Sequence, residues 1–131
     1  MYKILIAEDE SIERRMLCKT LTCQFPGELS ILEAKNGREA LELAREEKPR
    51  IAILDIEMPG LTGLEVAQQI RRERLNCVII FLTAYDNFEY ARRAISVQAL
   101  DYLLKPYDEE ELVVTLEAAM QMSDQIGRAH V

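Results

Sequence analysis

The feature that most constrains the fold is a fivefold alternation of short apolar runs with segments of helical periodicity. Alternation of this kind favours a parallel sheet, because right-handed crossovers place the helices on both of its faces. The sequence therefore predicts an α/β fold, a doubly wound (βα)5 parallel sheet. The apolar runs cover 3–7, 29–34, 51–54, 77–82 and 103–104.

Two of the runs predict where their strands lie in the sheet. Residues 51–54 are apolar at every position, which is typical of a central strand covered by helices on both sides. Residues 29–34 are more polar, which indicates an edge strand.

The helices are predicted from capping residues and apolar stripes. Ser11 is expected to cap the first helix, and the last helix is expected to start near Asp108. Residues 123–131 lack apolar periodicity and are expected to form a frayed tail. The inward stripes expected for the first and fourth helices are Ile12, Met16, Leu17 and Leu21, and Phe88, Ala91 and Ile95.

Length and charge limit the functions open to the chain. Its 131 residues predict one domain, over 2–122. A net charge of −7 argues against direct nucleic-acid binding, which draws on surplus Lys and Arg. No apolar run is long enough to span a bilayer, and the start of the chain does not resemble a signal peptide. Membrane insertion and secretion are therefore not expected.

The cysteines favour a cytoplasmic protein with reduced thiols. There are three, Cys18, Cys23 and Cys77, and no two have C-x-x-C spacing. A structural zinc site requires more soft ligands than these, and the sole histidine is His130 near the end of the chain.

Polar residues stand where the predicted strands end. Glu8 and Asp9 follow the first strand, Asp55 the third, Thr83 the fourth and Lys105 the fifth. Ligands of open parallel sheets bind at the carboxyl ends of the strands, so these side chains are expected to meet at one edge. Taken singly, each has an ordinary structural explanation, such as a helix start, a strand-end cap or a surface lysine. Their convergence is what favours a site.

Three carboxylates around one pocket repel each other unless a cation lies between them. Mg²⁺ suits such oxygen ligands, and we expect Glu8, Asp9 and Asp55 to hold it together with the backbone carbonyl of Glu57. Thr83 and Lys105 would then surround a phosphoryl group, with Asp55 as its nucleophilic acceptor. The sequence contains no G-x-G-x-x-G, P-loop or G-x-S-x-G motif.

As a set, these segments resemble the receiver domains of two-component response regulators. The resemblance covers about residues 2–122 and implies a CheY-like, flavodoxin-like fold with strand order 2-1-3-4-5. The segments that carry it are Ala7-Glu8-Asp9-Glu10, Leu54-Asp55-Ile56-Glu57-Met58-Pro59-Gly60, Leu82-Thr83-Ala84 and Asp101-Tyr102-Leu103-Leu104-Lys105-Pro106.

The resemblance assigns roles to several residues. It implies that Asp55 accepts the phosphoryl group from a sensor histidine kinase and that Thr83 and Tyr102 form the switch. It implies a cis peptide between Lys105 and Pro106. Glu57 and Tyr85 match positions where members of the family tune the dephosphorylation rate.

The resemblance also implies partners. Residues 84–91, 94–95 and 101–106 are similar to receivers that precede AraC-type DNA-binding domains. Residues 123–131 are therefore expected to be a tail or the start of a linker to such a domain, and DNA would be bound only through that domain. The face formed by the fourth helix, fifth strand and fifth helix is a candidate homodimer surface. Arg92 and Arg93 would pair there with Asp101 and 108–111, or else belong to a solvated surface of mixed charge.

Two hypotheses of function remain, together with a more distant third. The first is a signalling domain, not a turnover enzyme, that is phosphorylated on Asp55, dephosphorylates itself and controls transcription. The alternative is a receiver-like interaction module that works without phosphorylation; the intact site residues argue against it. An aspartyl-phosphatase is more distant, because Glu57 stands where such enzymes carry a second aspartate.

Overall fold

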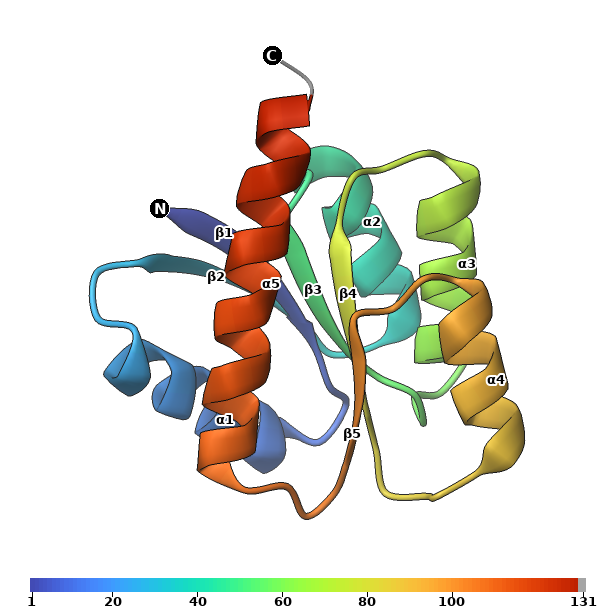
Figure 1. Cartoon of the computed structure of the whole chain (residues 1–131). Helices are drawn as coiled ribbons and strands as arrows, with labels where there is room; N and C mark the ends of the chain where they lie inside the picture. Colours follow the sequence, from blue (N-terminus) through green and yellow to red (C-terminus); the bar gives the residue numbers. More distant parts are fainter. Residues whose placement is uncertain (130–131) are drawn as a thin grey trace.

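The computed structural model describes residues 1–129 and, within them, a sheet of five parallel strands in the order β2-β1-β3-β4-β5 (Figure 1). The predicted fold class and strand order are confirmed. The strands are β1 (Tyr2–Ala7), β2 (Leu29–Ala34), β3 (Ile51–Asp55), β4 (Val78–Thr83) and β5 (Asp101–Leu104). The helices are α1 (Ser11–Gln24), α2 (Gly37–Glu47), α3 (Gly63–Arg72), α4 (Phe88–Ser96) and α5 (Glu109–Ala129).

The helices cover both faces of the sheet and divide its core into two layers (Figure 1). α2, α3 and α4 pack on one face, where Leu41, Ile70 and Phe81 belong to a single buried cluster. α1 and α5 pack on the other face, around Leu21 and Leu116. Every residue of β3 is buried, as predicted for a central strand, and β2 lies at an edge with several half-buried side chains.

The start of α1 differs from the prediction. Glu10 occupies the N-cap position without a side-chain hydrogen bond, and Ser11 is already the first helical residue. Ile12 and Met16 are 72% and 64% exposed, so the buried face consists of Leu17 and Leu21. Successive helical residues point about 100° apart, so a stripe displaced by one position leaves the core.

The predicted inward stripe of α4 was wrong for the same reason. Phe88 and Ile95 are 83% and 76% exposed, whereas Ala94 is buried in the core. Tyr90 packs against the core cluster that contains Ala94. The helix carries apolar residues on two adjacent stripes, and the outer one remains in contact with solvent.

The helical end of the chain was also missed. α5 continues to Ala129, so the frayed tail expected from 123 onward is helical as far as the structure describes it. Polar contacts hold this part. Arg50 Nη2 lies 3.0 Å from Asp124 Oδ1, Arg50 Nε donates to Ser123 Oγ at 2.8 Å, and the Tyr2 hydroxyl donates to Asp124 Oδ2 at 2.9 Å. An apolar pattern does not reveal such an anchor. The domain boundary at 122 stays a prediction. His130 lies outside the residues that the structure describes.

The three thiols differ in environment, which predicts their order of alkylation. Cys23 is exposed, whereas burial raises the pKa of Cys18 to about 11 and that of Cys77 to about 12. Because the thiolate is the nucleophile, the raised pKa lowers the reactive fraction of Cys18 roughly 100-fold from that of an ordinary thiol, and the exposed Cys23 is expected to react first at pH 8. Cys77 is expected to react only after unfolding. Peptide mapping after timed iodoacetamide labelling checks the order, and equal rates for Cys18 and Cys23 would contradict it.

In the part of the chain that the structure describes, we find no helix that combines the length and the apolar character needed to cross a membrane.

Candidate functional site

The ends of four neighbouring strands bring the predicted residues to one edge of the sheet. Asp55 ends β3 and pairs in register with Leu82, one residue before Thr83 at the end of β4. Glu8 directly follows β1, and Lys105 directly follows β5. The parallel register makes these strand ends level, so residues up to 97 positions apart in the sequence meet.

Three carboxylates form the centre of this edge. One oxygen each from Glu8, Asp9 and Asp55 lies within 4.8 Å of the others. Glu8 and Asp55 are only 2% and 4% exposed. Burial raises the pKa of Glu8 to about 8 and also raises the pKa of Asp55, because their charged forms lose hydration. The electrostatics therefore favour a cation at this place.

Asp55 has one oxygen with no partner. Its Oδ2 lies 3.4 Å from Lys105 Nζ, whereas its buried Oδ1 makes no hydrogen bond among the described residues. A buried carboxylate oxygen without a partner is costly unless something binds it. Together with the hard oxygen donors of Glu8 and Asp9, this orphaned atom fits a site for a divalent cation such as Mg²⁺.

Lys105 is the cation that faces the cluster. Its Nζ lies 2.8 Å from Glu8 Oε1 and 2.8 Å from Glu13 Oε2. Burial disfavours its charge, but the hydrogen bonds to Glu13 and Glu8 and the charge of Asp55 outweigh burial and raise the pKa of Lys105. The peptide bond between Lys105 and Pro106 is cis.

Glu13 is a participant that sequence reasoning missed. It lies on α1, and its hydrogen bond to Lys105 holds the pKa of its carboxyl below the usual range. The only signal in the sequence was a carboxylate one turn after Asp9, on a helix that starts beside the site.

The side chain of Glu57 is engaged, which the sequence did not predict. Its oxygens lie 2.9 and 2.8 Å from the Thr83 hydroxyl, and Oε1 lies 3.4 Å from the Ala84 amide nitrogen. Thr83 is fully buried, and its Oγ1 also accepts from the Tyr85 N–H at 3.1 Å. The sequence had offered only the backbone carbonyl of Glu57 as a ligand.

Tyr102 contacts the loop between β4 and α4. Its hydroxyl donates to the Tyr85 carbonyl at 2.7 Å and accepts from the Asn87 N–H at 3.4 Å. The ring is half-buried and packs against the core. One aromatic side chain of β5 therefore holds the loop that follows Thr83.

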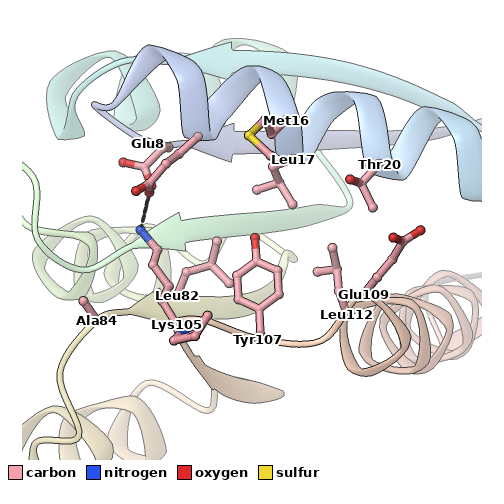
Figure 2. Close-up of a pocket in the computed structure, with 12 residues that line it drawn as sticks. Glu8, Met16, Leu17, Thr20, Leu82, Ala84, Lys105, Tyr107, Glu109 and Leu112 are labelled. Atoms are coloured by element: carbon pink, nitrogen blue, oxygen red, sulfur yellow. Dashed lines mark hydrogen bonds and ion pairs between the residues drawn. The ribbon is translucent and has the colours of Figure 1, made fainter.

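A groove opens beside the site (Figure 2). Its volume is about 520 Å³, and it lies between α1 and the start of α5. Figure 2 shows Glu8 and Lys105 joined at one end, and Leu17, Tyr107 and Leu112 lining the rest. The charged cluster thus lies at one end of a groove whose lining is partly apolar.

The carboxylate cluster predicts that Mg²⁺ stabilises the fold. At a free Mg²⁺ concentration of ten times its dissociation constant, the free energy of unfolding should rise by about 1.4 kcal/mol. This corresponds to a rise of roughly 4 °C in melting temperature. Thermal unfolding with MgCl2 and with EDTA measures the rise. Asp9→Asn should abolish most of it, whereas Asp86→Asn, an exposed carboxylate outside the cluster, should keep it. An equal response in both variants would contradict the site.

Comparison with known proteins is consistent with this geometry. The family model described as "Response regulator receiver domain" matches residues 4–117. The sensory transduction protein LytT of Oceanobacillus iheyensis is 41% identical over 116 residues, which are 86% of this chain and 46% of that protein. The transcriptional regulatory protein HptR of Staphylococcus aureus is 36% identical over 133 residues, 98% of this chain and 52% of that protein.

A solved structure adds the ligand state of one relative. The response regulator TrrA from Thermotoga maritima, in complex with Mg²⁺-BeF, has a TM-score of 0.80 and 34% identity, and the match covers 91% of this chain and 99% of that one. This chain spans about half the length of the curated relatives it matches.

Proposed function

The chain belongs to the family of response regulator receiver domains, and from this premise we propose that Asp55 is its phosphoryl acceptor. A receiver domain of two-component systems is a signalling domain. The observation that carries the proposal is the buried Asp55, whose Oδ1 has no partner among the described residues and whose Oδ2 faces Lys105. A nucleophilic oxygen with a cation beside it suits aspartyl-phosphate chemistry.

The proposed step moves a phosphoryl group from a histidine kinase. The P–N bond of its phosphohistidine breaks, the ring nitrogen keeps the electron pair, and a P–O bond forms to Asp55. Lys105 would leave Glu8 to neutralise the phosphoryl oxygens, and Thr83 would donate its hydroxyl to one of them. Water would later hydrolyse the acyl phosphate. Mg²⁺, held by Glu8, Asp9, Asp55 and the carbonyl of Glu57, would supply positive charge at the same oxygens.

The output of the domain is part of the same proposal. Movement of Thr83 toward the phosphoryl group would release the loop that Tyr102 holds and let its ring turn inward. This would change the face formed by α4, β5 and α5, where Phe88 and Ile95 are exposed. We propose this face as the surface for homodimerisation and for control of an output domain of the AraC type in the full-length cytoplasmic protein.

The contacts of two charged residues on that face favour the alternative of a solvated surface of mixed charge. Arg92 pairs with Glu89 of its own helix at 3.0 Å, and Asp101 accepts from Thr115 of the same domain at 3.1 Å. Exposed ion pairs stabilise little in any case. The exposed apolar side chains of α4 are therefore the better support for a dimer.

The test is the intact mass after incubation with acetyl phosphate and Mg²⁺. The wild type should gain one phosphoryl group of about 80 Da that hydroxylamine removes. Asp55→Asn should gain nothing, and the matched variant Asp86→Asn should gain the same mass as the wild type. A gain in Asp55→Asn would refute Asp55 as the acceptor. No gain in any variant, together with no binding of beryllofluoride, would favour the interaction module that works without phosphorylation.

A further inference from the structure

The switch hydroxyl already has an anionic partner in the resting domain. The carboxylate of Glu57 lies within 2.9 Å of Thr83 Oγ1 and 3.4 Å of the Ala84 nitrogen. The hydroxyl also accepts from the Tyr85 N–H, so it has both a donor and an acceptor. Within the described part of the chain, this network is formed by residues of β4 and of the two loops beside it.

The geometry of this contact is that of an anion bound at the end of β4. Thr83 and Ala84 are adjacent, and both direct a donor at the same carboxylate. Glu57 follows Asp55 by only two residues, so its side chain and a group on Asp55 can reach the same donors. Its carboxylate thus provides the same kind of acceptor as a phosphoryl oxygen.

The contact of Thr83 with Glu57 and its contact with a phosphoryl oxygen exclude each other. A threonine hydroxyl has one proton to donate, so Thr83 cannot donate to Glu57 and to a phosphoryl oxygen at the same time. A phosphoryl group on Asp55 must therefore displace Glu57 before Thr83 can bind it.

We infer that Glu57 is an internal competitor for the switch, a positioning residue whose carboxylate holds the Thr83 hydroxyl and the Ala84 amide in the resting domain. The inference rests on the proposed function, because it assumes that Thr83 binds the group on Asp55. Hydrogen bonds to charged groups are among the stronger ones, so Glu57 biases the population toward the resting state. The residue at position 57 thereby determines how much of the phosphoryl group's binding free energy is needed to separate Glu57 from Thr83.

The test is a double-mutant cycle on affinity for beryllofluoride in the presence of Mg²⁺, measured by ¹⁹F NMR. Glu57→Ala should tighten binding about tenfold when Thr83 is present. In the Thr83→Val background, the same change should tighten binding about twofold or less, because the hydroxyl that Glu57 held is gone. Equal tightening in both backgrounds would show simple charge repulsion and overturn the inference.

Glu10→Ala is the control for the purely electrostatic effect of removing one carboxylate near the site. Glu10 lies near the same edge, is exposed, and makes no side-chain cap hydrogen bond. Its removal should change the affinity about twofold or less. A tenfold gain from Glu10→Ala would count against Glu57 as a specific competitor.

A second readout needs no phosphoryl analogue. Amide hydrogen exchange at Ala84 and Tyr85 in the resting protein should quicken several-fold in Glu57→Ala and stay unchanged in Glu10→Ala. Unchanged exchange in Glu57→Ala would overturn the inference. If neither the wild type nor any variant bound beryllofluoride, the proposed function would fail, and the competition inferred from it would fail too. Binding by the wild type that Glu57→Ala leaves unaltered would contradict the inference only.

Discussion

Replacing Lys105 by glutamine is expected to move metal binding and phosphoryl transfer in opposite directions. Lys105 Nζ lies 2.8 Å from Glu8 Oε1 and 3.4 Å from Asp55 Oδ2, within the carboxylates that suit Mg²⁺. Removing a positive charge there should raise the affinity for Mg²⁺ about tenfold, because the two cations no longer repel each other. The rate of phosphorylation of Asp55 should fall about 100-fold, because a fixed charge at the phosphoryl oxygens is lost.

Isothermal titration with MgCl2 and the time course of intact mass with acetyl phosphate measure the two effects. The matched control is Lys3→Gln, because Lys3 pairs with Glu47 in an exposed contact at the opposite end of β1. It should leave both quantities within about twofold of the wild type. A weaker affinity for Mg²⁺ in Lys105→Gln would mean that the lysine supports the metal site, and it would contradict the predicted repulsion between Lys105 and Mg²⁺.

The convergence of the site was predictable because it depends on strand ends. Asp55, Thr83 and Lys105 each stand where an apolar run stops, and parallel strands in register bring such positions together. The contacts of Glu13 and Glu57 were not predictable in this way. The first depends on the rotation of α1 about its axis, and the second on the path of the loop after β3.

In the fold as well, some features were predictable from the apolar pattern, and others depend on how the elements pack. The burial of β3 follows from its apolar run, whereas the strand order was implied by the family resemblance. The faces of α1 and α4 do not follow from the apolar pattern, because Met16 and Ile95 are apolar yet lie one position away from the stripe that is buried. The end of α5 depends on Arg50 and Asp124, a polar pair between segments distant in sequence. Hydrophobic periodicity carries no information on such a polar pair.

Replacing Gly63 by alanine is expected to destabilise the fold strongly. A Cβ at this position would lie against the carbonyl oxygen of Asp55 and within 2.9 Å of its carbonyl carbon, because α3 begins directly beside the end of β3. The Gly63 N–H also donates to the Ile56 carbonyl at 3.0 Å. Since the obstacle is backbone and not a flexible side chain, Gly63→Ala should lower the free energy of unfolding by about 3 kcal/mol.

Two other glycines make the measurement specific, because neither meets backbone. Gly60→Ala places its Cβ in open space and suffers only from a φ of 76°, a cost of about 1 kcal/mol. Gly127→Ala lies in α5, with a Cβ 3.9 Å from Arg50 Nη2, and should be neutral or stabilise by about 0.5 kcal/mol. Urea unfolding should therefore rank the variants in that order. If the free energies of unfolding of Gly63→Ala and Gly127→Ala differed by less than about 1 kcal/mol, the start of α3 would be free to move away from Asp55. The close approach of these two backbones would then not be what fixes the position of Asp55.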